Sequence, residues 1–140
     1  MPRADYHSDS EKVKTTTLDQ FFAQSESAPP ILIKIDVEGY ETEVIASADD
    51  ILSQPPIKAV IMELEGYGKR YGFDETMLHS RMIDYDFAPC SYAPFDRKLI
   101  VLDDNNKRYG NNLYIKKQNI GSVRERLLTA PAVHIHETTI

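Results

Sequence analysis

The segment from Ile31 to Glu41 constrains the fold of this chain more than any other. It reads Ile-Leu-Ile-Lys-Ile-Asp-Val-Glu-Gly-Tyr-Glu, so a run of aliphatic residues ends on two acidic residues and a glycine. Such a run predicts a buried strand, and in open α/β sheets the ligand crevice lies beyond the carboxyl ends of the strands. Asp36 and Glu38 would then stand at the lip of a crevice, and Gly39 would let the backbone turn into a helix. The alternative is a solvated helix start, where the helix dipole favours negative charge without any role in chemistry.

A second strand with an acidic ending follows after one helix. Apolar residues recur at helical spacing from about Tyr40 to Ser53, and the Pro-Pro pair that follows prevents this helix from continuing. Residues 59–65, Ala-Val-Ile-Met-Glu-Leu-Glu, then predict the second strand. A strand–helix–strand unit forms a right-handed parallel crossover, which brings Asp36 and Glu63 to the same edge of the sheet. Lys34 shares a strand face with Asp36 and is expected to orient one carboxylate.

The remaining elements are expected from shorter patterns. They are a short strand over 13–17, a helical turn capped by Thr17, a mobile loop over 66–72, a helix from about Glu75 to Tyr85 capped by Asp74, and a short basic helix over 122–128. Residues 97–102 and 113–116 are expected to pair as a β-hairpin, because Asp-Asp-Asn-Asn at 103–106 suits a turn. The hairpin would close a mostly parallel sheet flanked by helices, which is an α/β fold.

Composition excludes several classes of partner. The 140 residues include 16 Lys and Arg against 22 Asp and Glu, a net charge of −6, which disfavours binding to nucleic-acid phosphate. No apolar run approaches the roughly 20 residues that a membrane span needs.

The single cysteine, Cys90, cannot form an internal disulfide and is expected to be a buried, inert thiol. We therefore expect a cytoplasmic chain. The predicted elements divide it into a loose lead-in over 1–12, a folded part over 13–117 and a tail with a short helix over 118–140.

Four segments together resemble the FkbM family of S-adenosylmethionine-dependent methyltransferases. They are Thr-Leu-Asp at 17–19, Lys-Ile-Asp-Val-Glu-Gly-Tyr-Glu at 34–41, Ile-Met-Glu-Leu at 61–64 and Asn-Asn-Leu-Tyr-Ile at 111–115. The resemblance covers roughly residues 13–117. It implies a partial Rossmann-like methyltransferase sheet that contains the last four strands, with S-adenosylmethionine as the cofactor of the intact domain.

The first half of such a domain is not recognisable in this sequence. In the family it would supply a glycine-rich loop that wraps the cofactor, yet no Asp/Glu-x-Gly-x-x-x-Gly segment follows a predicted strand here. The resemblance therefore implies a fragment or a truncated form, and a pseudo-enzyme that pairs with another polypeptide is a further possibility. The open sheet edge would need cover from residues 1–25, from a protein partner or from a second copy.

The resemblance places the chemistry on three carboxylates. Methyl transfer to a small-molecule, glycan or lipid hydroxyl requires loss of the hydroxyl proton, and Asp36, Glu38 or Glu63 could be the base. Alternatively, these carboxylates could hold a divalent cation that lowers the pKa of the hydroxyl. Two other classes compete with an FkbM-like O-methyltransferase. One is a binding or scaffold module without chemistry, and the other is a different α/β protein, such as a phosphotransfer receiver, with acid at its strand ends.

Overall fold

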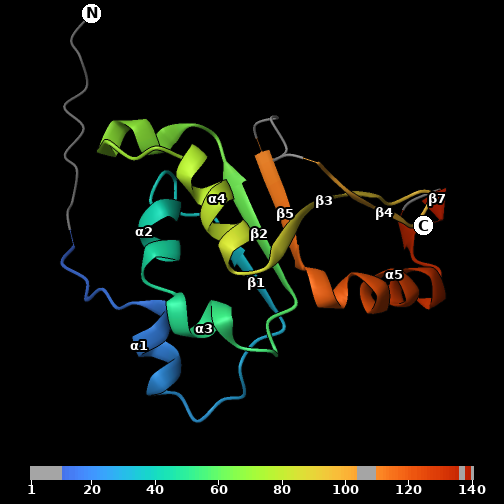
Figure 1. Ribbon diagram of the computed structural model, residues 1–140, viewed down its shortest axis with the longest axis horizontal. Coiled ribbons are helices and arrows are strands. Elements are labelled where there is room, and N and C mark those ends of the chain that lie inside the picture. Colours follow the sequence, from blue (N-terminus) through green and yellow to red (C-terminus); the bar gives the residue numbers. More distant parts are fainter. Residues whose placement is uncertain (1–10, 104–109, 136–137, 140) are drawn as a thin grey trace, which may run out of the picture.

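The computed structural model describes residues 11–103, 110–135 and 138–139, and in this part the chain forms a mixed α/β domain (Figure 1). A five-stranded sheet has the order β1-β2-β5-β3-β4. The strands are β1 (Leu32–Ile35), β2 (Ala59–Leu64), β3 (Phe87–Ala93), β4 (Lys98–Val101) and β5 (Gly110–Lys116). The pair β1 and β2 is parallel, whereas β5 is antiparallel to both of its neighbours. The predicted α/β class and the parallel pairing of the first two strands are confirmed. The expected mostly parallel sheet is wrong, since three of its four strand pairs are antiparallel in the described residues.

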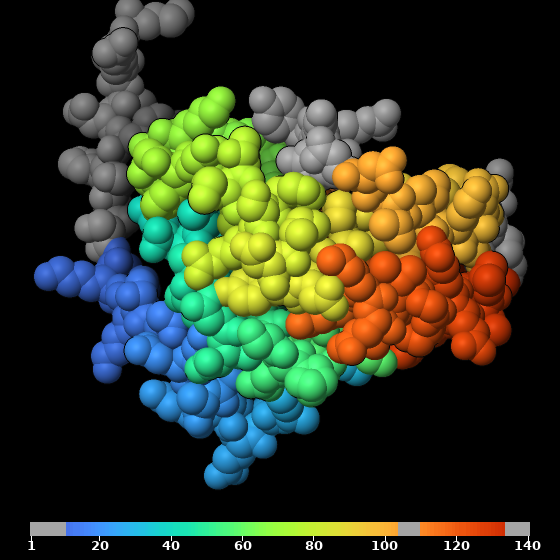
Figure 2. Space-filling view, viewed as in Figure 1, coloured from blue at the N-terminus to red at the C-terminus, as the bar shows by residue number. Residues whose placement is uncertain are grey.

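Helices cover the two faces of the sheet unequally. They are α1 (Leu18–Ala23), α2 (Glu41–Ala46), α3 (Asp49–Ser53), α4 (Thr76–Asp84) and α5 (Ile120–Thr129), with 3-10 turns η1 (Tyr67–Tyr71) and η2 (Lys117–Asn119). The main core lies between one face and α1 to α4, and includes Ile35, Val60, Met62 and Tyr114. A smaller core lies under α5, around Cys90, Leu99 and Ile115. Figure 2 shows α1 (blue) and α5 (orange to red) at opposite ends of the molecule.

One of the two predicted helix caps is confirmed. The hydroxyl of Thr17 accepts a hydrogen bond from the Gln20 N–H at 3.0 Å, as an N-cap does. Asp74 is not the N-cap of α4, because this helix begins at Thr76 and its N-cap is Glu75; Asp74 accepts a hydrogen bond from the Thr76 N–H at 3.0 Å in the turn before the helix. Cys90 is buried, and burial raises the pKa of its thiol, as an inert thiol requires.

The predicted hairpin is wrong. β4 pairs with β3, and the two strands are joined by a tight turn after Ala93. β5 lies between β2 and β3 instead of beside β4, because Tyr114 and Ile115 point to opposite faces and both need cover. The sheet therefore has five strands in the described residues, where four were expected. Most of the predicted turn over 103–106 lies outside those residues.

Three further expectations are corrected. The helix expected from Tyr40 to Ser53 is two short helices, α2 and α3, which are separated at Ser47 and Ala48. Residues 13–17 form no strand. The central strand expected to be covered on both faces is β1, an edge strand of the described sheet, in which Leu32 is exposed and Ile35 is buried. A separate two-stranded sheet, β6 (His134–Ile135) with β7 (Thr138–Thr139), follows α5.

Candidate functional site

The carboxylates of Asp36 and Glu63 meet at the edge where β1 and β2 end. The Nζ atom of Lys34 lies 2.6 Å from Oδ2 of Asp36 and 3.7 Å from Oε2 of Glu63. The register pairs Lys34 with Ile61, so these side chains project from the sheet face opposite the main core. Lys34 thus bridges two acidic groups from neighbouring strands, as its position beside Asp36 in the sequence indicated.

This ion pair sets the charge of the site. The hydrogen bond from Lys34 holds the pKa of Asp36 below its ordinary value of 3.8, and the bond to Asp36 raises the pKa of Lys34 above 10.5. Both side chains are about half exposed, so the pair is solvated and stabilises the fold little. Its main effect is to hold the Asp36 carboxylate close to Glu63 at this edge of the sheet.

The turn that follows β1 is held by Glu41, which is buried. One oxygen of Glu41 accepts hydrogen bonds from the Val37 N–H at 3.2 Å and from the Gly39 N–H at 3.3 Å. Between these donors, Glu38 has a φ of 54°, a left-handed conformation that few residues with a side chain adopt. Glu41 therefore fixes an unusual turn and, with it, the direction of Glu38.

Gly39 lets the next loop approach this turn. Its φ is 105°, and a Cβ atom at this position would lie 2.8 Å from the carbonyl carbon of Tyr67. Contacts that short do not occur, so only glycine permits the backbone of the η1 turn to pack here. The loop expected to be a mobile lid is thus in direct backbone contact with the end of β1.

These residues enclose a small acidic notch. Its lining consists of Asp36, Glu38, Gly39, Glu41, Glu63, Glu65 and Tyr67, and its volume is about 20 Å³. The structure therefore brings all three predicted site residues, Asp36, Glu38 and Glu63, to one place. A space of this size admits a single water molecule or hydroxyl group.

Comparison with known families agrees with the sequence motifs at the notch. A family model described as the methyltransferase FkbM domain matches residues 3–92. The chain belongs to the FkbM methyltransferase family. Comparisons with curated proteins and with solved structures found no match. The FkbM match begins earlier than the expected residue 13 and ends within β3, well before the expected residue 117, but it includes every residue of the acidic notch.

One element of the FkbM resemblance has a structural role here. In the Thr-Leu-Asp segment, Asp19 accepts hydrogen bonds from the N–H groups of Asp50 at 3.0 Å and Ile51 at 2.8 Å. These two donors belong to the first turn of α3, so Asp19 caps that helix from α1. Asp19 thus ties α1 to α3 and lies away from the notch.

The described residues do not form a cradle for S-adenosylmethionine by themselves. The space beside Gly39 is occupied by the Tyr67 backbone, and Gly66 and Gly72 bound the η1 turn. The loop over 66–72 that follows β2 is glycine-rich but lacks the spacing of a dinucleotide-binding loop. The outer edge of β1 has no partner strand among the described residues.

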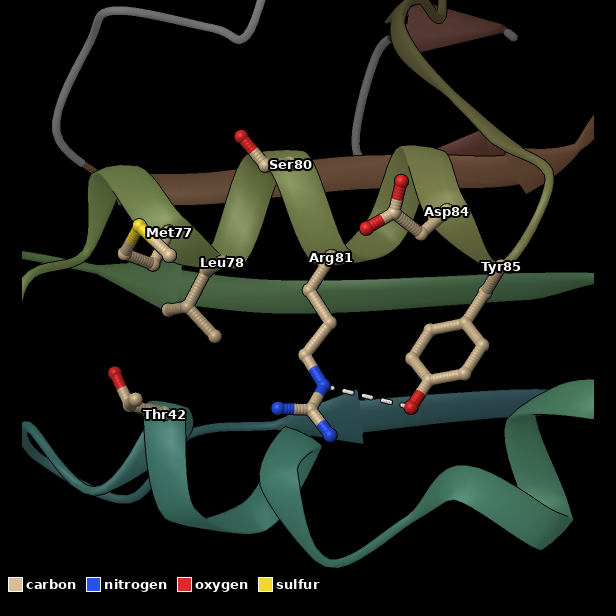
Figure 3. Close-up of a pocket in the computed structure, with 7 residues that line it drawn as sticks. All are labelled: Thr42, Met77, Leu78, Ser80, Arg81, Asp84 and Tyr85. Carbon is tan, nitrogen blue, oxygen red and sulfur yellow. Dashed lines mark hydrogen bonds between the residues drawn. The ribbon is translucent and has the colours of Figure 1, made fainter.

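A larger pocket of about 400 Å³ lies between α2 and α4 and is separate from the notch (Figure 3). Within it, Arg81 points toward Tyr85, and both side chains hydrogen-bond to Asp49 at the start of α3. These contacts tie the end of α4 to α3. The pocket therefore contains a structural link between helices and none of the predicted site residues.

Sequence reasoning missed Glu41 and Tyr67. Glu41 belongs to the family motif, but its hydrogen bonds depend on the left-handed backbone at Glu38, which no pattern of residue types revealed. The only available signal for Tyr67 was its position directly after the glycine that ends the second strand.

Proposed function

We propose that this chain forms the acceptor side of an S-adenosylmethionine-dependent O-methyltransferase and is a fragment or truncated form of it. In the intact enzyme the cofactor would be held mainly by a polypeptide segment outside this sequence. Membership of the FkbM methyltransferase family supports the reaction class. The observation that carries the acceptor role is the meeting of Asp36, Glu38 and Glu63 at one notch that is large enough for a hydroxyl group. The expected cytoplasmic location is part of this proposal; no helix in the described ranges is long and apolar enough to cross a membrane.

The carboxylates would receive the acceptor hydroxyl and its proton. Carboxylates are acceptors only, so a hydroxyl that enters the notch donates its hydrogen to one of them. Lys34 orients Asp36 through their ion pair, while Glu38 has no ion-pair or hydrogen-bond partner in the described part of the chain. Catalysis would then consist of proton removal and of holding the oxygen in line with the methyl donor.

A divalent cation at the notch receives no support from this arrangement. No group of three or more His, Cys, Asp or Glu side chains within the described ranges is placed to hold a metal ion. Lys34 instead supplies the positive charge that compensates Asp36 and Glu63. We therefore assign the carboxylates to hydrogen bonding and proton transfer.

The test is methyl transfer from labelled S-adenosylmethionine by a polypeptide that contains this sequence together with a glycine-rich cofactor loop. We expect label in a hydroxyl-bearing acceptor, and a fall of at least about a hundredfold in turnover for Asp36→Asn, the scale of losing a general base. Glu125→Gln, a change of an exposed carboxylate on α5, is the matched control and should leave turnover unchanged. Undiminished turnover of Asp36→Asn would remove Asp36 from the site.

A binding or scaffold module is the second candidate, and the edge of β1 favours it. Ile31 and Leu32 are each about half exposed, and an apolar groove of about 480 Å³ runs along β1 between Phe21 and Val44. An unpaired strand beside an apolar groove is suited to pairing with an extended segment of another polypeptide. In this case the chain would bind its partner stably and no methyl transfer would follow when the two are combined.

A further inference from the structure

Beside the acidic notch lies a cluster of aromatic rings, called the ring platform here, which consists of the exposed Tyr40 and Tyr71 and the half-buried Phe73. The ring centroids of Tyr40 and Tyr71 are 4.3 Å apart, and Phe73 lies 5.9 Å from Tyr40 and 6.2 Å from Tyr71. Tyr40 and Tyr71 are each 46% exposed although they touch one another. In Figure 2 the loop over 66–73 (green) forms an outer corner of the molecule next to α2.

The backbone joins the ring platform to the notch at two points. Tyr40 directly follows Gly39, and Tyr71 ends the η1 turn that Tyr67 begins, while both Gly39 and Tyr67 line the notch. Because the Gly39 and Tyr67 backbones are in contact, the platform and the carboxylates keep a fixed relation. A ligand that rests on the rings can therefore place a group in the notch.

We propose that the acceptor is a carbohydrate, whose ring lies against the exposed Tyr71 ring while one hydroxyl enters the notch. The rings of the platform are tilted to one another by 39° to 71°, so a sugar ring would stack on one of them at a time. This inference rests on the proposed function and names its substrate class. The faces of aromatic rings carry partial negative charge and attract the C–H groups on a sugar face. The carboxylates accept hydrogen bonds from sugar hydroxyls, and Glu38 and Glu65 have no partner among the described residues that would compete.

The geometry disfavours a cationic ligand, which aromatic rings and carboxylates could otherwise attract. A cage for a quaternary ammonium group needs ring faces around an open space, with the cation within about 6 Å of each centroid. The direct contact between Tyr40 and Tyr71 leaves no such space between them. The Tyr67 ring already has the Arg70 guanidinium over its face, 4.4 Å from the centroid.

Anionic and long apolar acceptors fit less well. Five carboxylates line the notch, and Lys34 compensates only two of them, so a phosphate or carboxylate group would be repelled. The notch is polar and admits one hydroxyl-sized group, which leaves no channel for an acyl chain. A neutral ring with several hydroxyl groups satisfies both the platform and the notch.

Saturation-transfer NMR on this chain tests the proposal without cofactor or turnover. The probe is a mixture of the methyl glycosides of glucose, galactose, mannose, fucose and N-acetylglucosamine, at about 10 mM in total because single-sugar affinities fall in the millimolar range. On irradiation of the aromatic protons, we expect saturation of the ring C–H signals of at least one glycoside. The Tyr71→Ala variant should lower it by about threefold or more, and Tyr71→Phe should retain it. The matched control is Tyr92→Ala, a change of a partly exposed tyrosine on β3, which should have no effect.

The outcomes separate this proposal from the proposed function. Absence of saturation for every glycoside, equal saturation in Tyr71→Ala, or saturation of added choline in their place would overturn the carbohydrate assignment. Methyl transfer to an acceptor that is not a sugar would overturn it as well, while leaving the methyltransferase function intact. Conversely, if glycosides bind in a way that depends on Tyr71 but no methyl transfer is detected, the carbohydrate site is upheld and the methyltransferase function is rejected.

Discussion

At the scale of single residues, Lys34, Gly39 and Glu41 decide how the acidic lip is built. Lys34 compensates two carboxylates, Glu41 holds the turn through two N–H groups, and Gly39 admits the Tyr67 backbone. Each acts on the position or charge of Asp36 and Glu38 without being one of the predicted bases. Substitutions can separate these contributions, because Lys34 acts through its charge, whereas Gly39 and Glu41 act through the backbone conformation.

Gly39→Ala should destabilise the domain by about 2 kcal/mol or more. Alanine is strained at a φ of 105°, and its Cβ would lie 2.8 Å from backbone that cannot move alone. The matched control is Gly121→Ala in α5, where a Cβ meets nothing within 4 Å and alanine should gain up to about 1 kcal/mol. Urea unfolding measures both. Equal effects of the two substitutions would show that the Tyr67 loop does not pack on this turn.

Lys34→Met should raise the pKa of Asp36 toward its ordinary value of 3.8, because the hydrogen bond and the positive charge of Lys34, which lower it, are lost. A titration followed by carboxyl carbon chemical shifts measures this pKa. Asp74 is the internal control, since hydrogen bonds from Thr76 lower its pKa and do not involve Lys34. An unchanged Asp36 titration would mean that the ion pair does not form in solution.

The same pair predicts a pH dependence of stability. The pKa of Asp36 is lowered in the folded state, so its contribution is present above the unfolded pKa and is lost as the pH falls through the folded pKa. Wild type should therefore be more stable than Lys34→Met above about pH 4, and the two should converge in more acidic solution. A difference that persists at pH values below the folded pKa would point to packing of the Lys34 stem instead of charge.

At the scale of elements, local sequence patterns predicted the parallel pairing of β1 with β2, but not the order of all the strands in the sheet. The crossover from β1 to β2 was predictable, because a parallel pair joined by a helix has one hand. The hairpin was wrong because two strands adjacent in sequence were assumed to be adjacent in space. Burial decides otherwise: β5 has buried side chains on both faces and lies inside the sheet, whereas Ile100 and Val101 of β4 remain 40% exposed at its edge.

Ile35→Ala should destabilise the fold by about 2 to 5 kcal/mol. Although β1 is an edge strand, Ile35 is only 3% exposed and packs in the main core beside Met62. Truncation would leave a cavity there. The control is Val13→Ala, at a side chain that is 76% exposed, which should change stability by less than about 0.5 kcal/mol in the same urea experiment. A small effect at Ile35 would mean that the end of β1, which leads to Asp36 and Glu38, is not anchored in the core.

At the scale of the whole molecule, the two ends of the sheet differ in kind. The β4 end is covered by α5, whereas the β1 end presents an unpaired edge and an apolar groove within the described part of the chain. The acidic notch lies at this second end, so any polypeptide that pairs with β1 would stand next to the carboxylates. Under the proposed function, a polypeptide that adds a strand beside β1 would therefore complete both the sheet and the methyltransferase site.

This coupling predicts that the chain alone binds S-adenosylmethionine more weakly than micromolar, that is, with less than about 8 kcal/mol of binding free energy. The reason is physical: the carboxylate lip is present, but no described glycine loop offers the backbone N–H groups and close approach that the cofactor needs. Titration calorimetry on this chain measures the affinity. The control adds a polypeptide that carries a glycine-rich first half, and the affinity should then rise at least tenfold, about 1.4 kcal/mol, if that half pairs with β1. Micromolar binding by the chain alone would mean that the notch and its surroundings hold the cofactor directly.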